Sequence, residues 1–196
     1  MSLYKIAHIV KDRLPFIWDG IEKVNEWLFV LRYGKKVKSI AVTCVPEGYE
    51  LVELKDIDTK LIVKFFEHQP EEAYTFFKPH GFDEKSIKRL QKNKSYLAYL
   101  LIDKANGQIA GYCFNRCFFQ GKGFRGRMVD VNYRGKGLGT AMNKMLNEVG
   151  FGIGLRLFES VSKDNLASYK SALSASNVKV VKELPHNELY LEIVKP

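Results

Sequence analysis

The sequence predicts a mixed α+β fold in which helices flank a twisted sheet, preceded by an N-terminal extension of one amphipathic helix and one strand. From Tyr49 onward, segments of helical and strand-like pattern alternate along the chain. Two pairs of strand-like segments are joined by short turns that are typical of antiparallel hairpins. The chain has 196 residues, of which 46% are hydrophobic and 27% charged, a balance typical of a globular protein with a sizeable core.

Residues 1–48 form the predicted extension, and the predicted domain covers residues 49–196. Within the extension, apolar residues recur at helical spacing from Ile17 to Leu31, with charged residues between them. Pro15 suits the first turn of this helix, and Gly34 suits its end. The segment 37–45 (VKSIAVTCV) is rich in β-branched residues, which predicts a strand.

The first part of the domain combines one strand with three helices. Asp58 or Thr59 is expected to cap the first helix, and Asp83 the third, because short polar side chains accept hydrogen bonds from the free amides of a first helical turn. The predicted ranges are a strand over 49–54 and helices over 58–68, 70–77 and 83–92.

The remainder of the domain alternates strands and helices and contains both hairpins. Asn106-Gly107 favours a tight turn in the first hairpin, and residues 185–187 connect the strands of the second. The predicted strands cover 95–103, 108–119, 126–131, 154–161, 178–184 and 188–194, and the predicted helices cover 139–150 and 165–176.

The composition narrows the classes of function. A net charge of +9 points to an anionic partner, which is a nucleic acid, a phosphorylated ligand or an anionic membrane surface. Charged residues interrupt every apolar run before it reaches the roughly 18 residues that a membrane helix needs. Cys44, Cys113 and Cys117 lack the companion ligands of a metal site. We therefore expect a cytoplasmic protein with free thiols and no bound metal.

The segment 133–142 (YRGKGLGTAM) connects a strand-like run to a helix and contains three glycines. Such a turn is suited to bind an anion, because free amides and the positive end of the helix dipole meet where no side chain blocks access. Arg134 and Lys136 add positive charge. The P-loop pattern is excluded, since Lys136 is followed by Gly137 instead of Ser or Thr. An ordinary glycine-rich turn is the alternative, and we favour a phosphate site.

The same segment resembles the acetyl-CoA loop of the GNAT superfamily of N-acyltransferases. The core pattern of that loop is Arg or Gln, two residues, Gly, one residue, and Gly or Ala, which Arg134, Gly137 and Gly139 match. Asn165 matches the asparagine that opens a later helix in the family. The resemblance covers residues 49–196. It implies a mostly antiparallel sheet in which two neighbouring strands are parallel and splay apart at the cofactor, here the strands within 127–131 and 155–161.

The resemblance implies an N-acetyltransferase that uses acetyl-CoA and no metal. A primary amine of a small molecule, such as an amino sugar, would attack the thioester directly in a ternary complex. In the family, loop amides hold the pyrophosphate, and the preceding strand pairs with the pantetheine arm. The cofactor-binding residues implied by the resemblance are Met128, Val129, Val131, Arg134, Gly135, Lys136, Gly137, Leu138, Gly139, Thr140 and Asn165. The cluster of cations at Lys122, Arg125, Arg127, Arg134 and Lys136 suits the same phosphorylated ligand.

Three residues are candidates for proton transfer. His80 lies in 76–82 (FFKPHGF), which resembles a Phe-x-Pro-His-x-Phe segment of some family members, and imidazole titrates near neutrality. Glu159, on the strand that follows the loop helix, is a second candidate base. Tyr169 is a candidate acid for the leaving thiolate, because Ala172 stands where many members carry a tyrosine.

Two alternatives to catalysis remain open at this stage. A nucleic-acid or ribosome-binding protein would use the +9 charge, and a non-catalytic CoA-binding protein would be consistent with the missing tyrosine. We expect a small-molecule amine as partner and no nucleic acid. For the extension, we favour packing of Trp18 and Trp27 against the domain over contact with a membrane surface, because Asp19, Glu22 and Glu26 dilute the basic face.

Overall fold

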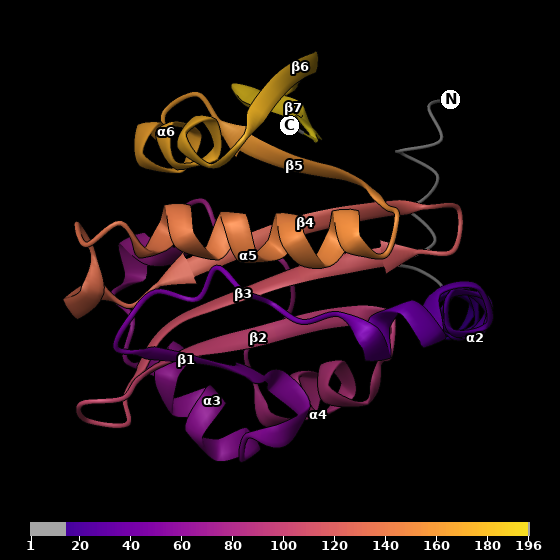
Figure 1. The fold of residues 1–196 in the computed structure, drawn as a ribbon, viewed down its shortest axis with the longest axis horizontal. Helices are drawn as coiled ribbons and strands as arrows, with labels where there is room; N and C mark the ends of the chain where they lie inside the picture. Colours follow the sequence, from indigo (N-terminus) through magenta and orange to yellow (C-terminus); the bar gives the residue numbers. More distant parts are fainter. Residues whose placement is uncertain (1–14, 196) are drawn as a thin grey trace.

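A seven-stranded sheet, in the order β1-β2-β3-β4-β5-β7-β6, forms the centre of the molecule (Figure 1). The structure, a computed structural model, describes residues 15–195 and the side chains of residues 19–195. The strands are β1 (Tyr49–Glu53), β2 (Tyr96–Asp103), β3 (Ile109–Phe118), β4 (Lys122–Val129), β5 (Arg156–Ser162), β6 (Asn177–Leu184) and β7 (Glu188–Val194). The helices are α2 (Pro15–Ser39), α3 (Thr59–Glu67), α4 (Glu84–Lys92), α5 (Leu138–Gly152) and α6 (Leu166–Ala175).

The predicted fold class is confirmed. All neighbouring strands are antiparallel except β4 and β5, which are parallel. Their pairing covers Lys122 to Phe124 on β4 and Arg156 to Phe158 on β5, although both strands continue beyond these residues. The predicted pair of parallel strands is therefore adjacent, and it separates towards the end of β4.

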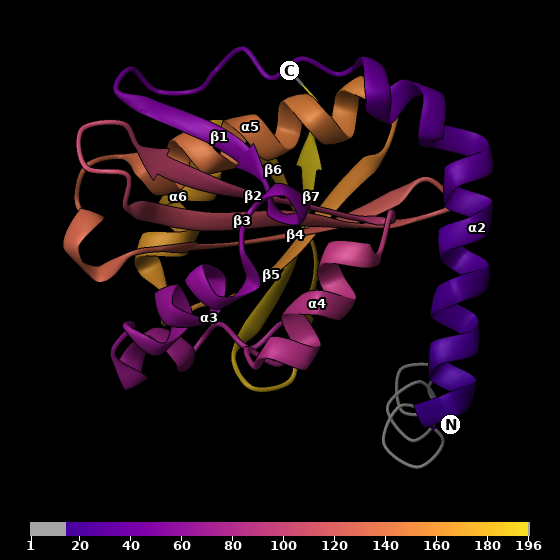
Figure 2. The same cartoon turned by 90° about the horizontal axis from the view of Figure 1, so that it is seen from below.

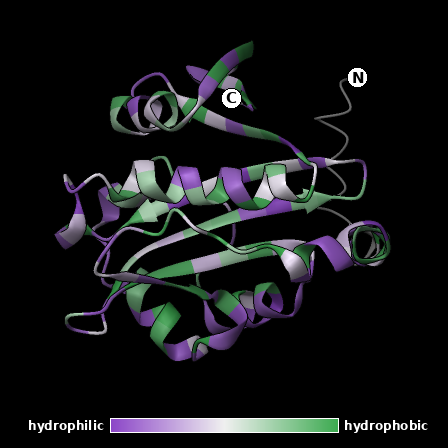
Figure 3. Ribbon diagram, viewed as in Figure 1, coloured by the Kyte–Doolittle hydropathy of each residue, from purple (hydrophilic) through white to green (hydrophobic). Residues whose placement is uncertain are grey.

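Helices cover both faces of the sheet, with α3 and α4 on one face and α5 on the other (Figure 2). Strand β3 contributes side chains to the core on both faces of the sheet, since neighbouring residues of a strand point to opposite faces. Tyr112 and Phe114 join the core beneath α3 and α4, and Cys113 joins the core beneath α5. In Figure 3, where the ribbon is coloured by hydropathy, hydrophobic residues accordingly recur along the central strands.

Side-chain caps fix the starts of three helices as predicted. Asp58 accepts a hydrogen bond of 2.7 Å from the Lys60 amide at the start of α3, and Asp83 accepts one of 3.0 Å from the Ser86 amide at the start of α4. Asn165 caps α6. Each cap satisfies an amide that has no partner inside its helix, which explains why these boundaries are readable from sequence.

The predicted strand over 37–45 is not formed. Helix α2 continues through Gly34 to Ser39, because Gly34 does not adopt the left-handed conformation that would end it. The residues that follow form no regular structure up to residue 46. The carboxylate of Glu148 on α5 accepts hydrogen bonds from the Thr43 and Cys44 amides, at 2.9 and 3.3 Å, in place of a strand partner.

Two other boundaries differ from the predictions. The segment 70–77, predicted as a helix, contains only a 3-10 turn at Glu71–Tyr74. Strand β4 begins at Lys122, four residues before the predicted start, because Gly123 pairs with Cys117 on β3 and so belongs to the sheet.

The predicted packing of Trp27 against the domain is wrong. Helix α2 lies at one end of the sheet and buries Phe29 and Tyr33, whereas Trp27 is 63% exposed (Figure 2). The side chain of Trp18, for which the same packing was predicted, lies outside the described residues.

Because α5 and β5 are in close contact at Gly150, we expect that adding a single methyl group there destabilises the protein. A Cβ atom on Gly150 would lie 2.5 Å from Cδ2 of Leu157, so Gly150→Ala should lower the free energy of unfolding by about 1–3 kcal/mol. Gly20 of α2 is the matched control, since a Cβ there meets nothing within 4 Å. Gly20→Ala should instead raise the stability by up to about 1 kcal/mol. Urea denaturation measures both, and equal effects would contradict the predicted packing.

Candidate active site

The separation of β4 from β5 creates a fork in the sheet, and an ion pair lies where the strands part. Arg125 and Glu159 are the residues that follow the last paired positions, Phe124 and Phe158. Nε of Arg125 donates to Oε2 of Glu159 at 2.7 Å, and both side chains are buried. Cross-strand backbone hydrogen bonds are thus replaced at this point by a side-chain contact.

The ion pair belongs to a larger buried network on the α5 face. Arg125 also donates to Oδ1 of Asn147 on α5. Arg127 approaches Glu159 at 3.4 Å and donates to the backbone oxygen of Ser168 on α6 at 2.8 Å. Removing one partner from such a pair typically costs about 3–5 kcal/mol, because a charge is left buried and unpaired. Arg125 and Arg127 are thus engaged with the same carboxylate of the protein, and their contribution to a phosphate site stays a prediction.

The glycine loop follows β4 and leads directly into α5. Asp130 fixes its start by accepting hydrogen bonds from the Asn132 amide at 2.9 Å and from Nε2 of Gln69 at 2.7 Å. Gly135 and Gly137 then take left-handed conformations, with φ of 77° and 76°. No side chain caps α5, and the Thr140 amide already donates to the Gly137 oxygen at 3.1 Å, so the amides of Leu138 and Gly139 remain available to a ligand.

One cleft of about 1300 Å³ connects the loop, the fork and the segment around His80. Most of the predicted cofactor-binding residues line it, namely Met128, Val129, Arg134, Gly135, Gly137, Leu138, Gly139, Thr140 and Asn165. Val131 and Lys136 do not. The Val131 amide donates to Oε1 of Gln69 at 3.1 Å, and Nζ of Lys136 lies 4.7 Å above the ring of Tyr133.

His80 lines the same cleft from the α3–α4 face, where aromatic rings surround it. Its ring centroid lies 5.0 Å from that of Phe82 and 5.7 Å from that of Tyr112. Nδ1 lies 2.8 Å from the Gly81 carbonyl oxygen, which can only accept, so Nδ1 carries the hydrogen. Burial lowers the pKa of His80 below its usual 6.5, which keeps the imidazole neutral at neutral pH.

A chain of hydroxyl groups extends from this imidazole back to the cleft. With the hydrogen on Nδ1, Nε2 of His80 accepts from the Tyr112 hydroxyl at 2.9 Å. Because the Tyr112 hydroxyl donates its only hydrogen in the bond to His80, it acts as the acceptor in its hydrogen bond with the Tyr96 hydroxyl, also at 2.9 Å. Burial raises the pKa of both tyrosines, so both keep their protons. Tyr96 lines the cleft and therefore forms its outer end.

Of the other two proton-transfer candidates, Glu159 lines the cleft at the fork and Tyr169 does not. Glu159 faces α5 and its carboxylate is held by two arginines, on the opposite side of the sheet from His80. On α6, the residues that line the cleft include Ser168 and Ser171, but Tyr169 is not among them. The reason is helical geometry, since Tyr169 is turned by about 100° from Ser168. The catalytic roles of all three candidates stay predictions.

Sequence reasoning missed the tyrosines and the pairing of the arginines. Tyr96 and Tyr112 could have been found from the predicted hairpin, because strand alternation puts both on the face that also carries Phe114. The spacing of Arg125 and Arg127 likewise indicated one shared face, but only the packing of β5 beside β4 supplies Glu159 as their partner.

Comparison with known proteins matches residues 62–172 to the model of the acetyltransferase (GNAT) family. No curated protein matches the chain by sequence. Similar solved structures include the GNAT domain of Streptomyces lividans PAT (14% identity, TM-score 0.65, 79% of this chain and 95% of that one). The ribosomal-protein-S5-alanine acetyltransferase of Vibrio fischeri is 19% identical (TM-score 0.59, 75% and 92%). AAC(6')-Ib in complex with paromomycin and acetyl-CoA is 15% identical (TM-score 0.55, 76% and 94%). At these identities the structures show the fold alone.

The environment of His80 predicts an acid-shifted titration. Its pKa should lie below 6.5 because burial disfavours the charged ring, and Tyr112→Phe should raise it by removing a donor to the neutral form. Between 6.5 and this lowered pKa, the unfolded chain binds more protons than the folded one, so stability should fall as the pH drops through that window. NMR titration of the ring, assigned with His80→Gln, measures the pKa. A value at or above 6.5 would contradict the buried, neutral ring.

Proposed function

The chain belongs to the GNAT acetyltransferase family, and we propose that it transfers the acetyl group of acetyl-CoA to a primary amine of a small-molecule acceptor. The observation that carries the proposal is the cleft, which runs without interruption from the uncapped start of α5 to the fork between β4 and β5. A donor held by its phosphates at the loop would reach the fork with its thioester. The acceptor would approach the fork from the α3–α4 face.

The residues of the loop fit acetyl-CoA. The open start of α5 offers amides and a positive helix end to the pyrophosphate, and Arg134 adds a cation beside it. Gly135 and Gly137 have no atoms within 4 Å of a Cβ position, so phosphate oxygens can approach the backbone there. Gly139 lies close to α6, since a Cβ atom on it would be 3.3 Å from Oγ of Ser171. A side chain at this position would therefore narrow the space between the loop and α6.

The acceptor half of the cleft is aromatic and bears carboxylates. Phe77, Tyr96 and Phe124 line it, and apolar ring faces of this kind commonly hold ring-shaped ligands. Glu72 and Glu188 lie along the same cleft, where either can pair with an ammonium group, and Lys78 and Arg116 line it as well. An amine carried on a polar ring, as in an amino sugar, combines both properties. AAC(6')-Ib, whose structure contains paromomycin, binds a ligand of this class.

The chemistry requires a proton to leave the nucleophile. When the neutral amine attacks the thioester carbon, the nitrogen becomes positively charged and acidic. We propose that its proton passes to the Tyr96 oxygen, while the Tyr96 proton moves to Tyr112 and the Tyr112 proton to Nε2 of His80. The carbon–sulfur bond then breaks, and the thiolate takes a proton from solvent. His80 is suited to this position because burial keeps it neutral before reaction.

The loop can be tested with a pair of matched glycine substitutions. Gly137 and Gly107 have similar left-handed φ angles, of 76° and 71°, and a Cβ on either meets nothing within 4 Å. Gly137→Asp should abolish acetyl-CoA binding, because the carboxylate repels the pyrophosphate. Gly107→Asp, in the β2–β3 turn, should impose the same backbone strain and leave binding intact. Calorimetric titration with acetyl-CoA measures both, and unchanged affinity in a folded Gly137→Asp protein would exclude this loop as the phosphate site.

The proton chain can be tested by turnover. His80→Ala should lower kcat by about a hundredfold, with little change in the affinity for acetyl-CoA, and the loss should shrink as the pH approaches the pKa of the amine. Tyr96→Phe should cause a similar loss, because it interrupts the same chain. His68→Ala is the control, since His68 is exposed and lies outside the cleft. Full turnover of His80→Ala at neutral pH, measured across a panel of amino sugars and other amines, would exclude His80.

A further inference from the structure

The outward side of α2 carries large apolar side chains that no described residue covers. Ile21, Val24, Trp27 and Leu31 are 52 to 67% exposed and recur at helical spacing. We call these four residues the outer face of α2. An exposed stripe of this kind commonly marks a contact site, and the proposed acetyl transfer makes no use of it.

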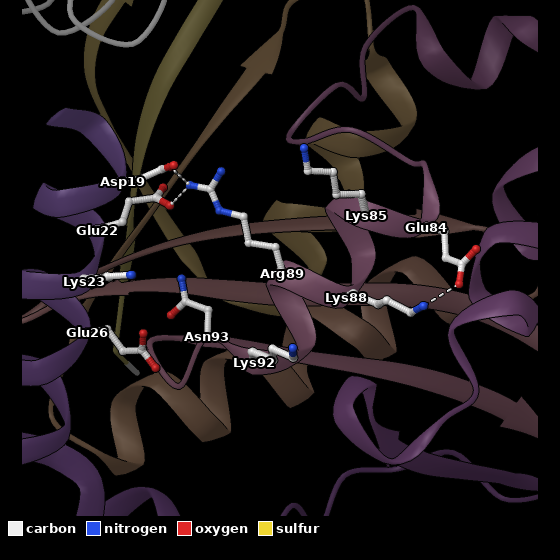
Figure 4. A pocket seen from close by; sticks show the side chains of 10 residues that line it. All are labelled: Asp19, Glu22, Lys23, Glu26, Glu84, Lys85, Lys88, Arg89, Lys92 and Asn93. Carbon is white, nitrogen blue, oxygen red and sulfur yellow. Dashed lines mark hydrogen bonds and ion pairs between the residues drawn. The ribbon is translucent and has the colours of Figure 1, made fainter. Parts of the chain in front are cut away.

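The acidic residues of α2 all lie on its inward side. Asp19 and Glu22 accept from Arg89 of α4 at 2.6 and 2.5 Å (Figure 4). Glu22 also accepts from Arg116 of β3. A carboxylate oxygen of Glu26 accepts from the Lys94 amide at 2.9 Å. The acids that seemed in the sequence to dilute a basic surface are therefore engaged with the domain.

The outer face continues into lysines towards the end of the helix. Lys35 and Lys38 follow Leu31 by four and seven residues, which puts both on the outward side, and both are exposed. Lys23 is exposed next to the apolar stripe. Within the described part of α2, the outward side thus combines apolar and positive groups and has no acid.

The domain fixes this orientation of the helix. Asn25 donates to the Cys117 backbone oxygen at 3.0 Å and accepts from the Phe119 amide at 3.0 Å. Phe29 and Tyr33 are buried beside Cys117. Rotation of α2 to hide its outer face would break these contacts and the ion pairs of Asp19 and Glu22. The exposed stripe is therefore built into the fold.

We propose that α2 docks the protein on an anionic phospholipid surface. Apolar side chains flanked by lysines on one side of a helix suit the interface of such a bilayer, where the side chains enter and the lysines meet the headgroups. No helix in the described part of the chain is long and apolar enough to cross a membrane, so the helix lies along the surface. A second copy of the chain fits less well, because this face offers no acid to pair with the lysines.

Flotation of the full chain with vesicles tests the docking. The wild type should bind vesicles of phosphatidylcholine and phosphatidylglycerol, but not phosphatidylcholine alone, and high salt should weaken the binding. Trp27→Glu and Leu31→Glu should each lower the partition coefficient by about tenfold or more. Replacing Lys35 or Lys38 by Gln should lower it by about fivefold each. Leu61→Glu, on the exposed side of α3 (56% exposed), is the matched control and should bind as the wild type does.

Tryptophan fluorescence locates the contact on the chain. The protein has two tryptophans, so Trp18→Phe leaves Trp27 as the single reporter. Its emission should shift to the blue with anionic vesicles and be quenched by brominated lipid. Failure of the wild type to float, equal loss in Leu61→Glu, or binding without quenching of Trp27 would overturn the proposal. Light scattering tests the alternative of a dimer. If the wild type is a dimer and Trp27→Glu is a monomer, the outer face binds a second copy and the proposal is overturned.

Discussion

Strands β4 and β5 pair over three residues and then part, with the Arg125–Glu159 ion pair at the branch point. Backbone hydrogen bonds lost beyond Phe124 have to be replaced, because a sheet cannot leave buried polar groups without partners. The ion pair, its neighbour Arg127 and the backbone of Ser168 supply contacts on the α5 and α6 side. The cleft opens where the two strands part, and residues from both sides of the sheet line it, from His80 to Ser171.

The two faces of the fork thereby acquire different chemistry. On the α5 face, the buried guanidinium groups of Arg125 and Arg127 share the single carboxylate of Glu159, which suits a structural role. On the α3–α4 face, aromatic rings surround His80 and a pair of tyrosine hydroxyls, which lowers the pKa of the imidazole by burial. A neutral imidazole at the end of a hydroxyl chain can accept a proton through that chain, whereas the carboxylate of Glu159 is held in an ion pair. Of the three candidates from the sequence, His80 therefore has the geometry best suited to accept a proton.

Helix α2 contacts the domain with both apolar and acidic side chains. Phe29 and Tyr33 are buried, and Arg89 and Arg116 pair with Asp19 and Glu22. The apolar residues of the outer face are consequently turned outward, with Trp27 among the most exposed residues. The ion pairs of the acids and the exposure of the apolar residues are two consequences of one docking geometry. The surface proposed for lipid contact is the outer face of α2, which the domain leaves uncovered.

Local patterns in the sequence determined most of the helices and strands, the caps at Asp83 and Asn165, the hairpins and the glycine loop, because each depends on residues close together in the chain. Contacts between residues that are far apart in the sequence decided the remaining features of the fold and the site. Glu148 replaces the strand predicted over 37–45, and the partners of Arg125 and of helix α2 come from other elements. Spacing shows which side chains share a face, but only packing shows which face meets which neighbour, since burial and partner choice are set by contacts across the whole chain.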